Sequence, residues 1–332
     1  MDRVGSRRAW IVGCQLGIAL VLAGFVFAVP GGTPFFALLF ALVALSATQD
    51  IAVDASTIEM SSREELGPAN GIRVTAYRIA MIVAGGVMVG LSATFGWSRL
   101  FLAAAAFFVV LAAANLRLPA AARAPGAREP ILEPIRDLLT SPGIAGVVAF
   151  VLLFKLGDLA LTPMVKPFWL DSGYSVEQIG WVQTTLGVGA SIVGALTGGL
   201  LTAKLGTFRA LWMLGAVQAL SNLGYYLAAA AGAPVGLMYG AAIVEQFTMG
   251  LGTAAFLAFL MSLCTRRHAA TQFALLSALY RVAGIAAGSV SGFLTVRAGY
   301  ETYFLLTFFL ALPGFLFLPS VRRALAAPRT AA

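Results

Sequence analysis

The sequence predicts an all-α integral membrane protein, and three observations support this prediction. Of the 332 residues, 60% are hydrophobic and 11% are charged, whereas about a quarter of the residues in a soluble domain are charged. The mean hydropathy is +0.90. The apolar residues are collected in long runs, and about 20 of them suffice for one helix to cross a bilayer. The sequence has no run of ten-residue segments of alternating polarity, so we expect helices rather than a membrane β-barrel.

Ten apolar segments are predicted to be transmembrane helices, separated by short polar or Gly/Pro turns such as Pro30-Gly31-Gly32. A long polar stretch with four prolines divides them into four and six. The segments are residues 9–29, 33–55, 72–93, 97–117, 143–168, 178–203, 208–231, 234–264, 270–296 and 301–319. We therefore predict an N-terminal helical half at 1–117, a cytoplasmic linker at 118–141, a C-terminal six-helix half at 142–320 and a cytoplasmic tail at 321–332.

The formal net charge of +8 is interpreted as a topology signal. If the N-terminus is cytoplasmic, sixteen of the 22 Lys and Arg residues fall in cytoplasmic loops and tails, and positive residues are retained on that side. We therefore expect both termini in the cytoplasm. Nucleic-acid binding is not expected, because the basic residues do not form a face with aromatic platforms. Two cysteines inside apolar runs and a single histidine predict neither a disulfide nor a metal site, and no cofactor.

An internal repeat predicts two homologous halves, a plan typical of secondary transporters. Residues 76–91 align without gaps to residues 279–294, with eight of sixteen positions identical, and residues 2–10 align to 203–211. In the second half two helices precede the aligned loop, whereas the first half begins at that loop. We therefore predict a ten-helix chain that is truncated at its N-terminus relative to twelve helices. We also expect the genomic reading frame to extend upstream of Met1.

Several stretches carry a resemblance to a transporter family. Residues 2–8, Asp2-Arg3-Val4-Gly5-Ser6-Arg7-Arg8, are similar to part of the loop between the second and third helices of the major facilitator superfamily. Within that superfamily the chain resembles the AmpG-like permeases, through SATQDIAVDA at 46–55, YRIAMIVAGG at 77–86, LLFKLGD at 152–158 and residues 250–279. The resemblance implies the major facilitator fold and a monomer in the bacterial inner membrane. It also implies import of anhydro-muropeptides for cell-wall recycling by proton symport. The implied cargo is N-acetylglucosamine linked to 1,6-anhydro-N-acetylmuramic acid, with or without peptide.

Two departures from the family pattern keep other functions open. The chain has Ser56-Thr57 where the family usually has Tyr-Arg, and Gln183-Thr184 where it often has Asn-Lys. The loss of two cations leaves transport of another large anionic solute, such as a coenzyme A thioester or a siderophore, as an alternative. A third interpretation is a ten-helix fragment that transports nothing. An enzyme is not expected, because no nucleophile and base pair, metal cluster or phosphate loop is present in the sequence.

Two carboxylates in the second apolar segment are candidates for proton coupling. Asp50 and Asp54 are four residues apart and therefore lie on one helix face. Two such carboxylates repel when both are ionised, so the pair is able to hold a proton near neutral pH. In the alternative interpretation Asp54, with Glu59 beyond it, pairs with Arg3, Arg7 or Arg8 to latch a closed conformation. Gating and structural roles are accordingly predicted for the loop residues Asp2, Arg3, Arg7 and Arg8 and for Glu59.

The remaining charges inside apolar runs are costly in a bilayer and need a partner, water or a function. Lys155 and Asp158, three residues apart, are either a self-neutralising structural pair or contacts to an anionic substrate group. Glu245, which has no cation one turn away, is predicted to line the substrate cavity together with these two residues and Gln183. Arg78 and Arg281 occupy equivalent repeat positions, so we expect both to have structural roles. The histidine, His268, follows two arginines and is expected to be solvated.

Overall fold

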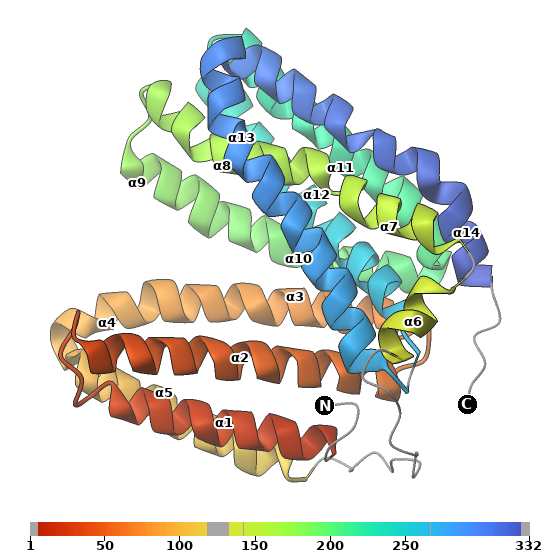
Figure 1. The fold of residues 1–332 in the computed structure, drawn as a ribbon. Coiled ribbons are helices and arrows are strands. Elements are labelled where there is room, and N and C mark those ends of the chain that lie inside the picture. The colour runs from red at the N-terminus through yellow and green to blue at the C-terminus, as the bar shows by residue number, and fades with distance from the viewer. Residues whose placement is uncertain (1–5, 118–132, 142, 266, 327–332) are drawn as a thin grey trace. The chain divides into compact units, whose positions relative to one another are not determined.

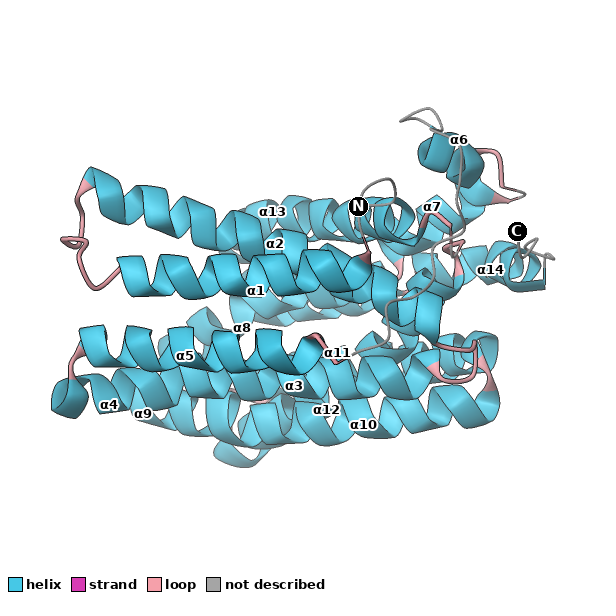
Figure 2. Cartoon of the chain, turned by 90° about the horizontal axis from the view of Figure 1, so that it is seen from below, coloured by secondary structure: helices cyan, strands magenta, loops and turns pink. Residues whose placement is uncertain are grey.

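The protein is all-helical throughout the described part of the chain. The computed structural model describes residues 6–117, 133–141, 143–265 and 267–326, and every regular element in these ranges is a helix (Figures 1 and 2). The elements in chain order are α1 Arg7–Gly24, α2 Thr33–Met60, α3 Leu66–Ile82, the π-helical turn η1 Val83–Val87, α4 Met88–Phe95, α5 Trp97–Asn115, α6 Glu133–Leu139, α7 Ile144–Leu153, α8 Leu156–Asp171, α9 Val176–Ile179, the π-helical turn η2 Gly180–Leu186, α10 Gly187–Leu205, α11 Thr207–Ala230, α12 Val235–Ser262, α13 Ala269–Ala311, the 3-10 turn η3 Pro313–Phe317 and α14 Leu318–Ala326.

Seven helical stretches within the described ranges are long and apolar enough to cross a membrane. They are α1, α2, α5, α12 and the longer stretches Ile144–Asp171, Val176–Leu205 and Ala269–Ala326. The predicted membrane-embedded helical fold is thereby confirmed. The count of ten transmembrane helices stays a prediction.

Glycines with positive φ separate helices where the sequence predicted turns. Gly96 has a φ of 73° and lies between α4 and α5. Gly299, with φ 77° and ψ 162°, interrupts the helical geometry of α13, between the predicted segments 270–296 and 301–319. Only glycine adopts such angles without strain, so both turns follow directly from the sequence.

Contacts divide the chain into two compact units. The first comprises Met1–Met60, Ile79–Ile135 and Thr265–Ala274, and the second comprises Ser61–Arg78, Arg136–Cys264 and Leu275–Ala332. The predicted domain boundaries at residues 117 and 142 remain a prediction.

In the first unit, α1 contacts both α2 and α5 (Figure 1). The buried residues Ile18 and Leu22 of α1 and Phe25, directly after its end, follow the spacing of one helix face. The Phe25 ring contacts the rings of Phe35 and Phe101, each with its centroid 5.3 Å away. This apolar core fixes α2, the helix that carries Asp50 and Asp54.

In the second unit, α12 packs against α10 and α11. Glycines allow α10 and α12 to approach closely: a Cβ atom added at Gly198 would lie 2.5 Å from the backbone oxygen of Leu251. A Cβ at Gly250 would likewise overlap the backbone oxygen of Ser191. Small residues at helix contacts are the usual means of tight packing in membranes. This packing holds the polar side chains of α10, α11 and α12 close together.

The start of α3 is fixed by a reciprocal pair of hydrogen bonds. The backbone N–H of Ser62 donates to Oε2 of Glu65 at 2.8 Å, and the backbone N–H of Glu65 donates to Oγ of Ser62 at 3.4 Å. This arrangement satisfies N–H groups that a helix start leaves free. The hydrogen bonds from Ser62 hold the pKa of the exposed Glu65 carboxyl below its usual value.

Candidate functional site

The polar site of the second unit is built around a break between two helices. α7 ends at Leu153 and α8 begins at Leu156, and Lys155 between them has a φ of −101° and a ψ of 5°. These angles depart from those of an α-helix. Interrupted membrane helices commonly line the binding sites of secondary transporters. The break places Lys155 immediately before the first turn of α8, which contains Asp158.

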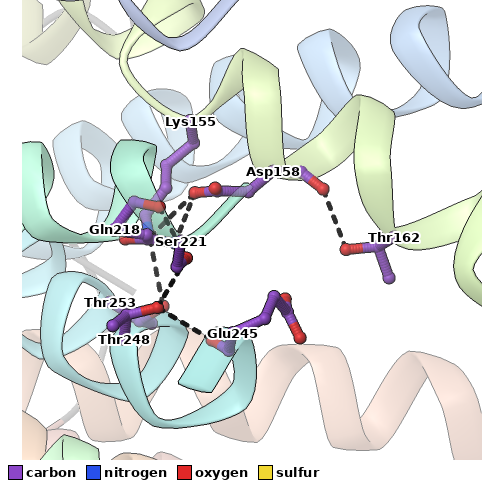
Figure 3. A network of polar contacts seen from close by, with 8 residues as sticks. All are labelled: Lys155, Asp158, Thr162, Gln218, Ser221, Glu245, Thr248 and Thr253. Carbon is purple, nitrogen blue, oxygen red and sulfur yellow. Dashed lines mark hydrogen bonds and ion pairs between the residues drawn. The ribbon is translucent and has the colours of Figure 1, made fainter. Parts of the chain in front are cut away.

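Lys155 and Asp158 form the ion pair that their spacing predicts, and a third residue bridges them (Figure 3). Nζ of Lys155 lies 3.5 Å from Oδ2 of Asp158. The same Nζ donates to Oε1 of Gln218 at 2.5 Å, and Nε2 of Gln218 donates to Oδ2 of Asp158. All three residues are buried. Both charges are thus neutralised within one network, which suits a bilayer interior.

Gln218 belongs to a polar stripe on α11 whose members were not among the predicted site residues. Gln218, Ser221, Asn222 and Tyr225 follow the spacing of one helix face, and all four are buried. The Thr248 hydroxyl of α12 donates to Oγ of Ser221 at 2.8 Å. The sequence signal that could have revealed this stripe is the spacing of these four polar residues within the apolar run 208–231.

Gln183 joins the same stripe from the π-helical turn η2. Its Nε2 donates to the Tyr225 hydroxyl at 3.0 Å, and both side chains are buried. π-Helical turns are rare and are frequent at functional sites. The structure therefore connects the predicted cavity residue Gln183 to the α11 stripe.

Glu245 of α12 lies in the same unit. It is buried, with 4% of its surface exposed. Its backbone oxygen accepts a hydrogen bond from the Thr248 hydroxyl. The Glu245 carboxyl points away from Lys155 in Figure 3. The predicted residues Lys155, Asp158, Glu245 and Gln183 all lie in the second unit, and Lys155 and Asp158 form an ion pair there. Their role in lining a substrate cavity stays a prediction.

The two candidate proton-coupling residues lie on α2, in the first unit. Asp54 is buried, with 5% of its surface exposed, whereas Asp50 is exposed. Their spacing puts them one helical turn apart, as predicted, but their surroundings differ. Their role in proton coupling stays a prediction.

Glu59, at the end of α2, is held by Arg7 of α1. Nε and Nη2 of Arg7 donate to Oε1 of Glu59 at 2.9 and 2.7 Å. Arg8 instead donates to the backbone oxygen of Leu116 at 3.3 Å. The predicted pairing of Glu59 with the N-terminal basic loop is therefore present, whereas its role as a latch is untested. Asp2 and Arg3 lie outside the described residues.

Arg78, Arg281 and His268 differ in their exposure to solvent. Arg78 is half-buried, whereas Arg281 is exposed. The two repeat-related arginines therefore have different surroundings. The expectation that His268 is solvated was wrong: it is 4% exposed, because backbone hydrogen bonds to Thr265 and Gln272 hold it in the buried turn that leads into α13.

Residues 1–231 match the Major Facilitator Superfamily. The chain belongs to this superfamily. Within it the chain is a member of the AmpG-like permeases. It is 33% identical over 329 residues to the anhydromuropeptide permease of Escherichia coli (strain K12), with 97% of this chain and 67% of the relative covered. It is 29% identical to the putative transporter AmpG 4 of Rickettsia conorii, with 94% and 79% covered. The chain is accordingly a multi-pass membrane transporter of small molecules and not an enzyme.

Solved structures of major facilitator transporters share the fold. The human organic anion transporter MFSD10 superposes with a TM-score of 0.75 at 17% identity, over 94% of this chain and 77% of that one. The transporter FucP in its outward conformation superposes with a TM-score of 0.74 at 16% identity, over 99% and 85%. These similarities confirm the major facilitator fold that the sequence predicted.

Proposed function

We propose that this AmpG-like permease imports anhydro-muropeptides across the bacterial inner membrane by proton symport, supplying them for cell-wall recycling. The observation that carries this proposal is the buried Lys155–Gln218–Asp158 network at the break between α7 and α8. A fixed cation and neighbouring amides are the groups that an anionic, hydroxyl-rich solute requires. The specific cargo in this proposal is taken from the description of a relative as an anhydromuropeptide permease.

Each polar group of the site has its own role in the proposed transport cycle. The Lys155 ammonium exchanges its intramolecular partners for an anionic group of the cargo, while Asp158 keeps the site neutral when the cargo is absent. The amide of Gln183 bonds sugar hydroxyl or acetamido groups. Glu245 lines the same cavity. Asp50 and Asp54 carry the proton that drives uptake. The two halves rock about this site to give alternating access, and the Arg7–Glu59 pair holds one of the closed conformations.

The proposal also includes topology and assembly. Both termini are cytoplasmic, because that orientation retains sixteen positive residues on the inner side. The protein acts as a monomer. A reporter fusion at the C-terminus that is active only in the cytoplasm tests the orientation, and an inactive fusion contradicts it.

Uptake of labelled N-acetylglucosaminyl-1,6-anhydro-N-acetylmuramic acid tests the function. The full chain is expressed in bacterial cells that lack their own permease, with the Lys155→Met variant as the site control. We expect uptake that a protonophore abolishes and that the variant lacks. Uptake at background level overturns the proposal. Full competition by a coenzyme A thioester or a siderophore, without uptake of the disaccharide, favours the other anionic cargo.

A further inference from the structure

The short helix α14 is held to the second unit by buried contacts on one of its faces. Val321 and Ala324 have 0% and 5% of their surfaces exposed, and the helix packs against α7 and α11. Ser320 lies so close to α7 that a Cβ atom added at Gly146 would overlap its Oγ. A helix of nine residues is only marginally stable on its own. α14 therefore depends on its neighbours for its structure.

The end of α14 has a further partner in the loop between α2 and α3. Nη1 of Arg63 donates a hydrogen bond to the backbone oxygen of Leu325 at 3.1 Å. This oxygen is one of the last four carbonyls of the helix, which have no partner within the helix itself. A cation at the C-terminal end of a helix is also favoured by the helix dipole. Arg63 thus stabilises the last turn of α14 in two ways.

Arg63 reaches α14 because the start of α3 is packed against other helices of the second unit. Residues 61–78 fall in the predicted N-terminal half, but their contacts assign them to the second unit. Nδ2 of the buried Asn70 donates to Sδ of Met261 on α12 at 3.2 Å. The Arg63–Leu325 hydrogen bond therefore joins the loop before α3 to the tail that follows the predicted C-terminal half.

We propose that the Arg63–Leu325 contact is a latch, through which α14 stabilises the conformation in which the start of α3 is packed against the C-terminal half. In the proposed transport cycle the two halves rock relative to each other, so a hydrogen bond between them exists in only one of their arrangements. When the loop withdraws, water replaces Arg63 at the Leu325 carbonyl, and the last turn of α14 frays. The latch thus makes α14 a control element for the rate of transport. The inference rests on the proposed rocking, but not on the identity of the cargo.

The distance between two spin labels tests the latch in the purified full chain in lipid nanodiscs. The labels are attached at Glu64→Cys and Lys204→Cys. Both positions are exposed, the first in the loop before α3 and the second near the end of α10. The native cysteines are removed by Cys14→Ala and Cys264→Ala. We expect a short and a long distance, which represent the two arrangements of the halves.

The ratio of the short to the long distance measures the contribution of the latch. Arg63→Gln should lower this ratio by about 2- to 10-fold, which corresponds to the loss of one hydrogen bond. Arg322→Gln removes the same charge from an exposed position of α14 and should leave the ratio unchanged. Val321→Ser disturbs the buried face of α14 and should lower the ratio while Arg63 is intact.

Two results would overturn the latch in different ways. An unchanged ratio in both Arg63→Gln and Val321→Ser overturns the latch alone. A single distance in the wild type, with and without the disaccharide, overturns the proposed rocking and the latch with it.

Hydrogen–deuterium exchange gives a second measurement, at α14 itself. The backbone amides of residues 322–326 should exchange faster in Arg63→Gln than in the wild type, because the last turn of the helix has lost its partner. Equal exchange in the two proteins overturns the proposal. If the wild type does not transport the labelled disaccharide, the proposed cargo fails, and the distances and the exchange still decide whether the latch exists.

Discussion

Nζ of Lys155 lies 3.5 Å from Oδ2 of Asp158, and both side chains are withdrawn from solvent, at 3% and 12% exposure. Removal of one member of such a pair leaves an unpaired charge in the interior. We predict that Lys155→Met or Asp158→Asn alone lowers the free energy of unfolding by roughly 3–5 kcal/mol. The double variant should lose clearly less than the sum of the two. Unfolding in mixed detergent micelles measures all four members of the cycle, and simple additivity would show that the pair is not coupled.

A methyl group at Gly252 tests the bridging position of Gln218. A Cβ added there would overlap Oε1 of Gln218 and lie 3.2 Å from Nζ of Lys155, whereas at Gly240, on the same helix, it would meet nothing within 4 Å. We predict that Gly252→Ala lowers stability by about 1–3 kcal/mol, the usual effect of overpacking, and abolishes uptake. Gly240→Ala should be neutral or slightly stabilising, since alanine favours helix. Equal behaviour of the two variants would contradict the network geometry.

The approach of α10 to α12 predicts a second contrast between glycines. A Cβ at Gly198 would lie 2.5 Å from the Leu251 backbone oxygen, whereas Gly189, also on α10, has no neighbour within 4 Å. Because backbone cannot move aside as a side chain can, Gly198→Ala should destabilise the protein by about 1–3 kcal/mol. Gly189→Ala should leave the stability of the protein unchanged. Thermal denaturation in detergent compares them, and an unaltered Gly198→Ala protein would disprove the close packing.

The Arg7–Glu59 pair predicts a charge-reversal result. The Nη2 to Oε1 distance is 2.7 Å, and the side chains are 10% and 19% exposed. Arg7→Glu and Glu59→Arg each place like charges together, so each should lower uptake and stability. The reversed pair, with both substitutions, should recover much of both, since partly buried charge-assisted bonds contribute about 1.5–3 kcal/mol. Failure of the double variant to recover either property would show that more than charge pairing is needed at this position.

The fold was predictable because it depends on features that are local in the sequence. Apolar runs of sufficient length define the helices, and Gly96 and Gly299 mark two of their ends. The Lys155–Asp158 pair was predictable for the same reason, since three residues of separation place side chains on one face.

Contacts between helices were not predictable in this way. Gln218 bridges Lys155 and Asp158 from a helix about 60 residues further along the chain, and nothing in its own neighbourhood specifies those partners. The repeat predicted like roles for Arg78 and Arg281, but Arg78 is half-buried and Arg281 is exposed. His268 was misjudged because the arginines before it suggested solvent, whereas the fold of the α13 start buries it.

Accumulation of labelled N-acetylglucosaminyl-1,6-anhydro-N-acetylmuramic acid in proteoliposomes tests proton-coupled import most directly. The purified 332-residue chain is reconstituted, and a proton gradient is imposed in the direction of uptake. We predict that the wild-type protein accumulates the disaccharide above its external concentration. A protonophore should abolish this accumulation, and the Lys155→Met variant should not show it. No uptake beyond that of protein-free liposomes, or accumulation that is indifferent to the gradient, would contradict the account.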